Sequence, residues 1–417
     1  MLYLLTRCAS CAAPLESGIK QCSRCKTRYC SESCQRDHWR NGHKRICKTI
    51  VRGANSLSRS GNAEQHYASN KFNEAATAAV EACAEDLKGQ TCYICTEAVN
   101  PRTGGLVRGC SCRGTAGIAH MSCLAEQAKL ATVKSQPMDQ KDYLRKIADW
   151  APWNTCPLCG QEYYGAVRCA LGWGCWYTHI ATVKYPRDFE DAFLARAMYQ
   201  LGLALVENDK YQEALGVFDA LWWCKTKLMD NETGAMVSIY FAKCLSKLGL
   251  ESNFWGPSKY PLSGLTIIQL VYYRIKQTFG EDHDLTMLCG LEAGTLLNEE
   301  HFVERAANYL AESYAASERV YGVRTTNALM LKLRWRYSEV SYKRHFFGHD
   351  DFRESFFITF EGLLINQRDS ARILGHEHPT TRGLHALLKL AMNEQLDWCL
   401  EDLNSDLKRR GWPKFRL

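Results

Sequence analysis

The stretch CSCRGTAGIAHMSC, residues 110–123, places Cys110, Cys112, His120 and Cys123 in one short segment. Two flanking pairs extend the pattern, Cys92-x2-Cys95 upstream and Cys156-x2-Cys159 downstream. Paired Cys and His at this spacing are typical of structural zinc, because two ligands on one tight turn can share a tetrahedral ion. We call this set the second ligand series, and its eight side chains predict two zinc ions: Cys92, Cys95, Cys110, Cys112, His120, Cys123, Cys156 and Cys159.

A first ligand series lies upstream, in residues 8–47. Its last two pairs, Cys30-x3-Cys34 and His43-x3-Cys47, have helical i, i+4 spacing, which puts both ligands of a pair on one helix face. His38 is the alternative to His43, but it lies only four residues after Cys34 and nine before Cys47. The series is Cys8, Cys11, Cys22, Cys25, Cys30, Cys34, His43 and Cys47. Together the two series predict four Zn²⁺ per chain.

Composition bears on compartment and partners. Of the 21 cysteines, 14 fall in the two series, and thiolates that must stay free for zinc favour a reducing compartment, cytoplasmic or nuclear. The formal charge of +7 is concentrated in residues 1–50, and bound zinc thiolates lower the charge of the chain to about +1. Nucleic acid is therefore not an expected partner. No run of about 20 apolar residues appears, and the apolar opening is too short for a signal peptide, so we expect no membrane association.

The segment from Tyr29 to Trp39, followed by His43 and Cys47, resembles a MYND finger. The match covers about 40 residues and fills every ligand position. The resemblance implies an interleaved pairing, in which one ion binds Cys8, Cys11, Cys30 and Cys34 and the other binds Cys22, Cys25, His43 and Cys47. It also implies a peptide-recognition module for short proline-containing segments, with Gln35 and Trp39 lining the groove. The alternative for Trp39 is a role as the apolar core of the finger.

The second series resembles a RING-CH (RING-variant) domain. The single residue between Cys110 and Cys112, the distance to His120 and the string Cys156-Pro157-Leu158-Cys159 all fit that family. A PHD finger is the alternative, but its gap before the His is usually shorter. The resemblance implies a cross-braced arrangement, with Cys92, Cys95, His120 and Cys123 on one ion and Cys110, Cys112, Cys156 and Cys159 on the other.

RING-CH domains resemble one another in acting as ubiquitin ligases, which hold a ubiquitin-loaded conjugating enzyme and orient its thioester. The resemblance places the docking surface at Ile94, Gln127 and Pro157. Position 127 departs from the family, because many members carry Trp there. Trp150 and Trp153, in the long loop between Cys123 and Cys156, are the candidates to take its place. We expect no catalytic side chains in the chain itself, since it contains no phosphate loop, nucleophile elbow or carboxylate dyad.

The remaining sequence predicts helices. Residues 63–87 have apolar positions at near-helical spacing, with Cys83 on the buried side, and predict one or two helices between the fingers. The aromatic, glycine-rich run from Tyr163 to Tyr177 predicts packing beneath the zinc domain, which is the expected role of Cys169 and Cys175. The pattern Met198-x2-Leu201-Gly202, followed by Tyr211-x2-Ala214, resembles a tetratricopeptide repeat, in which small residues let two helices pack closely.

A second signature recurs further on. Gly280-x2-His283-x2-Thr286 returns as Gly375-x2-His378-Pro379-x-Thr381, with a degenerate copy at residues 322–325. The spacing resembles the kinesin-light-chain type of tetratricopeptide repeat. Stacked helix pairs of this kind bury one another and offer a surface for protein partners. We read His283 and His378 as turn residues that cap the repeat helices.

The expected protein is mostly α, with two small cross-braced zinc-binding domains followed by a helical repeat array. The expected order is a MYND finger (residues 1–50), a helical linker (51–89), a RING-CH finger with an aromatic extension (90–180) and a tetratricopeptide-like domain (181–417). The function expected from the resemblances is a soluble RING-type ubiquitin ligase that recruits a conjugating enzyme and binds substrates or partners through the finger and the repeats. The alternative is a non-enzymatic zinc scaffold that joins proteins.

Overall fold

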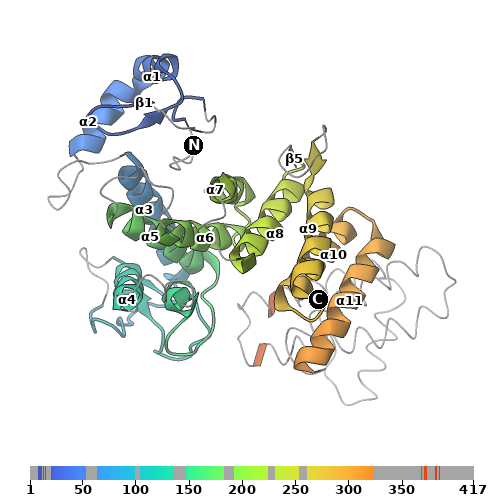
Figure 1. Ribbon diagram of the computed structural model, residues 1–417. Helices are drawn as coiled ribbons and strands as arrows, with labels where there is room; N and C mark the ends of the chain where they lie inside the picture. The colour runs from blue at the N-terminus through green and yellow to red at the C-terminus, as the bar shows by residue number, and fades with distance from the viewer. Residues whose placement is uncertain are drawn as a thin grey trace, which may run out of the picture. The chain divides into compact units, whose positions relative to one another are not determined.

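The computed structural model divides the chain into two compact units, Met1–Cys244 and Leu245–Leu417 (Figure 1). We call them the first and the second unit. The structure describes residues 8–11, 13, 15, 20–52, 63–98, 104–134, 147–182, 192–223, 231–252 and 261–322, together with positions 368, 371, 372, 381, 382 and 385.

The first ligand series forms a small ββα finger. Its elements are the antiparallel strands β1 (Lys20–Gln21) and β2 (Arg28–Tyr29), the helix α1 (Glu32–His38), a π-helical turn η1 (Trp39–His43) and the helix α2 (Lys44–Arg52). Ser31 begins α1 as its N-cap, where its side chain accepts from the amide of Cys34. Tyr29 and Ile50 form a small core with the buried cysteines of the finger. Helix α3 (Ala63–Cys83) contributes to this core through Ala63, whose amide donates to the carbonyl of Cys25 at 2.9 Å.

The second ligand series surrounds a short hairpin and one helix. Its elements are the antiparallel strands β3 (Leu106–Val107) and β4 (Ala119–His120), the helix α4 (Met121–Lys134) and the 3-10 helix η3 (Ile147–Trp153). Much of the described sequence between the third and fourth ligand pairs is therefore helical, and α4 packs against η3. This packing returns the chain to the zinc site for the last ligand pair.

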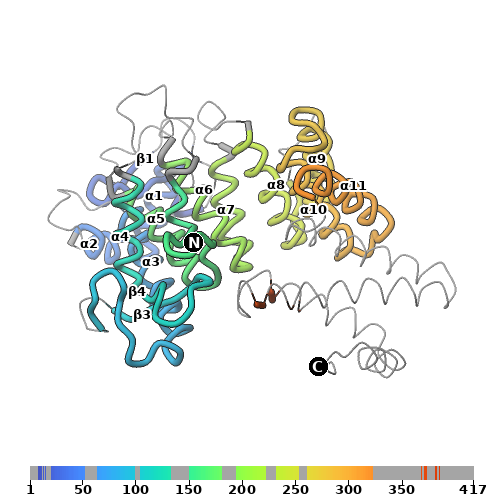
Figure 2. The backbone as a smooth tube through the Cα atoms, turned by 90° about the horizontal axis from the view of Figure 1, so that it is seen from below, coloured from blue at the N-terminus to red at the C-terminus, as the bar shows by residue number. Residues whose placement is uncertain are grey.

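A layer of four helices supports the second series within the first unit. These are α3 (Ala63–Cys83), α5 (Gly165–Thr182), α6 (Ala192–Val206) and α7 (Tyr211–Trp223). Helix α5 contacts α3, α4, α6 and η3, and α6 contacts α7 (Figure 2). A Cβ on Gly202 would lie 2.7 Å from Cζ of Phe218, so glycine permits the close approach of α6 and α7. The region between the two fingers is thus one helix packed on the aromatic extension, in which Cys169 and Cys175 are buried.

Helix α8 (Asn231–Lys247) crosses the division between the units. The second unit continues with an antiparallel pair, β5 (Glu251–Ser252) and β6 (Leu262–Ser263), and three packed helices, α9 (Gly264–Phe279), α10 (Asp284–Glu299) and α11 (Val303–Tyr321). Helix α10 contacts both α9 and α11. This stacking of successive helices confirms the predicted helical array for residues 264–321.

The turn between α9 and α10 uses the predicted signature residues. Gly280 ends α9 with a φ of +93°, a conformation that favours glycine. His283 is the N-cap of α10 and its Nδ1 accepts from the amide of Leu285, while the hydroxyl of Thr286 donates to the carbonyl of Gly280 at 2.6 Å. These contacts give His283 a structural role. The recurrence at residues 375–380 and the predicted helix faces at residues 352–364 lie outside the described residues.

The described chain is mostly helical and carries two zinc-finger folds and a helical array, which confirms the expected fold class. No helix among the described residues is long and apolar enough to cross a membrane.

Candidate metal centres

The structure gathers the sixteen predicted ligands into four groups, each of which could hold a metal ion. Within each group the four ligand atoms lie within 4.8 Å of one another. The groups are Cys8, Cys11, Cys30 and Cys34; Cys22, Cys25, His43 and Cys47; Cys92, Cys95, His120 and Cys123; and Cys110, Cys112, Cys156 and Cys159. This is the interleaved grouping that the two resemblances imply.

The distances between ligand atoms fit a tetrahedral zinc site. A Zn–S bond of about 2.3 Å gives sulfur atoms about 3.8 Å apart at tetrahedral angles. The Sγ–Sγ distances are 3.6 Å for Cys11 and Cys30, 3.7 Å for Cys22 and Cys47, and 3.8 Å for Cys112 and Cys156. Four thiol or imidazole donors at these separations match structural zinc.

Thiol crowding also favours a bound cation. Hydrogen bonds with the thiols of Cys11 and Cys34 raise the pKa of Cys30 to about 12, because they stabilise its protonated form. A divalent cation removes that penalty, because it stabilises all four deprotonated ligands at once. The first group is therefore suited to an ion.

Each histidine presents a different ring nitrogen. Nε2 of His43 lies 3.4 Å from Sγ of Cys25, whereas Nδ1 of His120 lies 3.3 Å from Sγ of Cys95. The other ring nitrogen of His120 lies 3.2 Å from the carbonyl oxygen of Ala98, to which it can donate. Such an outer hydrogen bond fixes the orientation of a ligating imidazole.

His38 belongs to the surroundings of the site. Its Nδ1 lies 3.0 Å from the hydroxyl of Tyr29, and its ring stacks on that of His43 at 4.7 Å between centroids. The structure therefore places His43, and not His38, among the four ligand atoms of its group.

Three of the Cys-x2-Cys pairs fold as the same turn. The amide of the residue after the second cysteine donates to the carbonyl of the first, from Lys26 to Cys22 at 3.0 Å, from Thr96 to Cys92 at 2.8 Å and from Gly160 to Cys156 at 2.9 Å. The three donors have φ of +61°, +63° and +66°. Lys26 and Thr96 adopt this conformation without the freedom of glycine, at a cost of about 1 kcal/mol each. The turn brings both thiols of a pair to the same side, where they can share an ion.

The four groups differ in exposure. Cys11 and Cys30 of the first group are exposed, whereas all four members of the second group are buried. Each group of the second ligand series has two buried and two half-buried members. A solvent-borne chelator has the most direct access to the group that contains Cys11 and Cys30.

The predicted docking residues lie on the second finger. Ile94 is half-buried and Pro157 is exposed, and the adjacent Leu158 is 53% exposed. Gln127 on α4 is half-buried and accepts a hydrogen bond of 2.8 Å from the hydroxyl of Tyr93, which lies beside Ile94. Tyr93 was not predicted from the sequence, because a tyrosine between two ligands carries no signal of a partner 34 residues away.

The prediction that Trp150 or Trp153 takes the place of the family tryptophan is wrong. Both indoles are buried, and Trp153 is 0% exposed. Its Nε1 donates to the hydroxyl of Thr132 at 3.0 Å, which ties η3 to α4. These side chains hold the connection between ligand pairs in place and have no surface to offer a partner.

Gln35 lies on α1, and Trp39 begins η1 of the first finger. Trp39 is 40% exposed, so it is not the apolar core of the finger, and its ring meets that of His43 edge-on at 6.0 Å. The side-chain amide of Gln35 donates to the carbonyl of Gln21 at 3.5 Å.

A buried arginine joins the second finger to the helical layer. Arg168 on α5 is 1% exposed, and its guanidinium donates to Glu207, to the carbonyl of Trp153 and to the side chain of Gln200. The signal in the sequence was a single charged residue inside an otherwise apolar and aromatic run. A buried guanidinium requires such partners, so Arg168 couples η3 to α6.

Comparisons with protein families identify two domains. A MYND finger matches residues 8–47 and a RING-variant domain matches residues 92–135. The chain therefore contains both domains. The second match ends before Cys156 and Cys159, which the structure brings back to Cys110 and Cys112.

Curated relatives match over short segments. The chain is 52% identical over 42 residues to Ubiquitin C-terminal hydrolase 15 of Oryza sativa subsp. japonica, which is 10% of this chain and 4% of that protein. It is 43% identical over 47 residues to Ubiquitin carboxyl-terminal hydrolase 19 of Arabidopsis thaliana, which is 11% of this chain and 7% of that protein. The chain thus covers less than a tenth of the length of these relatives.

Two solved structures resemble the chain. One is described as a kinesin light chain with nearly identical TPR-like repeats from Podosopora anserina, at 14% identity and a TM-score of 0.34, covering 52% of this chain and 95% of that one. A point variant of the same protein gives a TM-score of 0.35 at 14% identity, covering 54% of this chain and 100% of that one.

Proposed function

We propose that the chain is a ubiquitin ligase whose RING-variant domain binds a ubiquitin-loaded conjugating enzyme and positions its thioester for attack by a lysine. Each ligand group supplies four protein donors, so a bound ion has a closed coordination shell and serves to hold the fold. The chemistry then belongs to the conjugating enzyme, and this chain contributes orientation. The RING-variant match to residues 92–135 is the observation that carries this proposal.

The exposed side chains of the second finger support a docking role. Pro157 and Leu158 lie between the ligands Cys156 and Cys159, and Ile94 lies between the ligands Cys92 and Cys95. Turns fixed by a metal and by internal hydrogen bonds present apolar groups with little loss of conformational entropy on binding. We propose Ile94, Pro157 and Leu158 as the apolar contacts and Gln127 as a polar contact beside them.

The other parts of the chain suit partner selection. We propose that Gln35 and Trp39 of the MYND finger bind a proline-containing segment, and that the helical array binds a substrate or partner. The many thiols required for zinc favour action in the cytosol or nucleus.

A reconstituted ubiquitination reaction tests the proposal. Activating enzyme, ubiquitin, ATP and a panel of conjugating enzymes are incubated with the full zinc-loaded chain, and ubiquitin conjugates are measured. We expect conjugates with at least one conjugating enzyme and their loss in a Cys110→Ser/Cys156→Ser variant. A zinc-loaded chain that stimulates no member of the panel would contradict ligase activity.

A zinc scaffold without ligase activity is the second candidate. The hydrogen bond between Tyr93 and Gln127 favours it, because a polar, occupied side chain stands where many family members carry an apolar anchor. The same reaction distinguishes the two functions, since a scaffold leaves every conjugating enzyme at its basal rate.

A further inference from the structure

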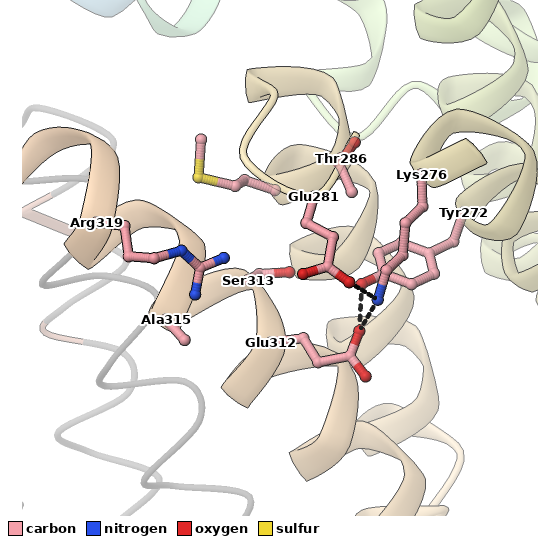
Figure 3. Close-up of a pocket in the computed structure, with 9 residues that line it drawn as sticks. Tyr272, Lys276, Glu281, Thr286, Glu312, Ser313, Ala315 and Arg319 are labelled. Atoms are coloured by element: carbon pink, nitrogen blue, oxygen red, sulfur yellow. Dashed lines mark hydrogen bonds and ion pairs between the residues drawn. The ribbon is translucent and has the colours of Figure 1, made fainter. Parts of the chain in front are cut away.

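A small polar cavity lies within the second unit, between α9, the start of α10 and α11 (Figure 3). Its volume is about 240 Å³, which is less than the roughly 300–1,000 Å³ typical of pockets for drug-sized ligands or cofactors. A space of this size suits one side chain of a partner. Its charged lining residues are Lys276, Glu281, Glu312 and Arg319.

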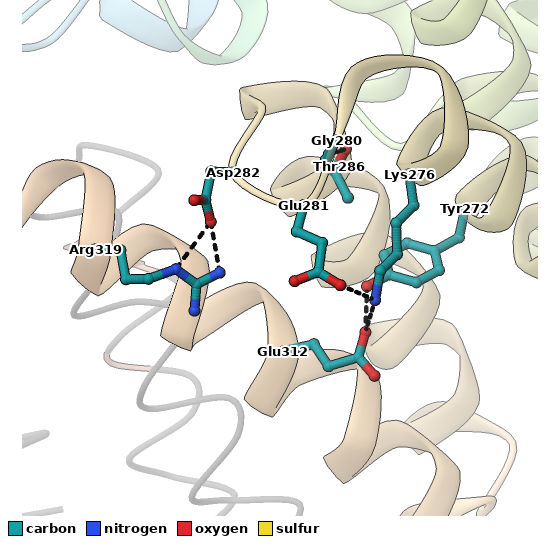
Figure 4. Close-up of polar contacts among 8 residues, drawn as sticks. All are labelled: Tyr272, Lys276, Gly280, Glu281, Asp282, Thr286, Glu312 and Arg319. Carbon is teal, nitrogen blue, oxygen red and sulfur yellow. Dashed lines mark hydrogen bonds and ion pairs between the residues drawn. The ribbon is translucent and has the colours of Figure 1, made fainter.

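An ion-pair cluster forms one wall of the cavity. Nζ of Lys276 lies 2.9 Å from Oε1 of Glu281 and 3.0 Å from Oε2 of Glu312, which also accepts from the hydroxyl of Tyr272 at 2.7 Å (Figure 4). Burial alone would raise the pKa of Glu312, but the hydrogen bonds from Tyr272 and Lys276 outweigh it and hold that pKa below its ordinary value. Glu312 is therefore ionised at neutral pH.

The cluster has an excess of negative charge. Arg319 is paired with Asp282 through Nε at 3.0 Å and through its terminal nitrogen. Three carboxylates, on Glu281, Asp282 and Glu312, thus face only two cations. The second oxygens of Glu281 and Glu312 have no hydrogen bond or ion pair among the described residues. They leave acceptor capacity for a further positive group.

A buried hydroxyl without a partner lies in the same wall. Ser313 is 2% exposed, and its Oγ has no hydrogen-bond partner in the described part of the chain. Its hydroxyl lies against Gly290 of α10, and Ser313 lines the cavity together with Glu281 (Figure 3). An unsatisfied buried hydroxyl is unfavourable by about 1–3 kcal/mol, and a donor group in the cavity would remove that cost.

We propose that this cavity, which we call the Ser313 cavity, binds the side chain of a lysine or arginine in a segment of a partner protein. A bare metal ion is disfavoured because the ammonium of Lys276 already lies between the carboxylates. An anion is disfavoured by the net charge, which also excludes nucleic acid as the occupant. A flexible basic side chain can extend its methylenes past Met287 and place its charge beside Glu281 and Glu312.

Direct binding to the full zinc-loaded chain tests this site. The probes are fluorescein-labelled pentapeptides, capped at both ends, with alanine at four positions and a central lysine, arginine, acetyl-lysine, glutamine or glutamate. We expect the lysine and arginine peptides to bind at least about tenfold more tightly than the other three, with weaker binding as salt increases. Equal anisotropy changes for all five peptides, or none, would overturn the proposal.

Paired variants locate the binding. Glu281→Gln/Glu312→Gln should weaken the lysine peptide about tenfold, because it removes both charges while keeping side-chain size. The matched control Glu300→Gln/Glu304→Gln removes two exposed charges outside the cavity and should leave binding unchanged. Equal effects of the two double variants would overturn the assignment.

Ser313→Ala separates a binding role from simple packing. It keeps the small side chain that lies against Gly290 and removes only the hydroxyl. We expect weaker lysine-peptide binding with an unchanged or higher unfolding temperature. Unaltered binding by this variant would remove Ser313 from the site. Because no conjugating enzyme is present, these outcomes are independent of whether the chain is a ligase.

Discussion

The hydroxyl of Tyr93 donates a hydrogen bond of 2.8 Å to Oε1 of Gln127, which joins the first ligand pair of the RING-variant domain to helix α4. Burial raises the pKa of the Tyr93 phenol to about 12, so the hydroxyl keeps its proton at neutral pH. Gln127 is therefore held in place, with its acceptor oxygen occupied. The proposed docking surface is polar at the position where many family members are apolar.

Replacing Gln127 by tryptophan should strengthen docking. Gln127→Trp supplies the apolar anchor, and we expect about five- to tenfold tighter binding of a cognate conjugating enzyme, since a buried indole can contribute more than about 1 kcal/mol to an interface. Surface plasmon resonance with the immobilised chain measures this change. Tyr93→Phe is the control for loss of the hydrogen bond alone. Weaker binding by both variants than by the unmodified chain would show that the polar pair itself makes the contact.

A chelator should remove the zinc ions from the chain in kinetic phases of different rate. Cys11 and Cys30 are exposed, so we expect a chelator to remove the ion of their group before the other three. Absorbance of a zinc-sensitive dye, recorded over time, should show one fast equivalent and three slower ones. Cys11→Ser should remove the fast phase, whereas a fast phase that survives in Cys11→Ser and is lost in Cys25→Ser would assign the labile ion to the buried group.

Arg168 should be important for stability of the first unit. Arg168→Met leaves the Trp153 carbonyl and the Gln200 side chain without their donor, and we expect the free energy of unfolding to fall by about 3 kcal/mol. Urea denaturation of the zinc-loaded chain measures it. Arg36→Met, at an exposed position of α1, should cost less than about 0.5 kcal/mol. Similar losses in both variants would mean that the buried network contributes little.

Trp39 should contribute to binding without supporting the fold. Because the indole is 40% exposed, Trp39→Ala should weaken capture of a proline-containing peptide while the finger keeps its two zinc ions. Tyr29→Ala should instead release zinc, since that ring is buried among the ligands. Peptide selection from a proline-biased display library, with zinc content as the second readout, distinguishes these outcomes. Loss of zinc in Trp39→Ala would assign the indole to the core.

The zinc groups were predictable because ligand type and spacing constrain the fold directly. The interleaved grouping followed from resemblance to two families, and the structure gives the same groups. The side-chain pairs that set the properties of the surface were not predictable. Tyr93 meets Gln127 of α4 across 34 residues of sequence, and this depends on packing between residues distant in sequence.

The tryptophans illustrate the same limit. Trp150 and Trp153 were candidates to replace the family tryptophan, but η3 forms and buries both against α4 and α5. The helix turn at Gly280 and His283 was predictable because its glycine and capping residue act locally. Sequence signals that act within one turn predicted the local structure correctly. Contacts between residues distant in sequence are seen only in the structure.

The measurement that tests ligase function most directly is single-turnover discharge of ubiquitin from a loaded conjugating enzyme to free lysine. It compares the zinc-loaded chain with Ile94→Ala and with Ile46→Ala, which truncates an exposed isoleucine on the other finger. We predict that the unmodified chain and Ile46→Ala accelerate discharge at least about tenfold and that Ile94→Ala abolishes the acceleration. No acceleration by the unmodified chain with any conjugating enzyme would contradict the proposed ligase, and acceleration that persists in Ile94→Ala would contradict the docking role of Ile94.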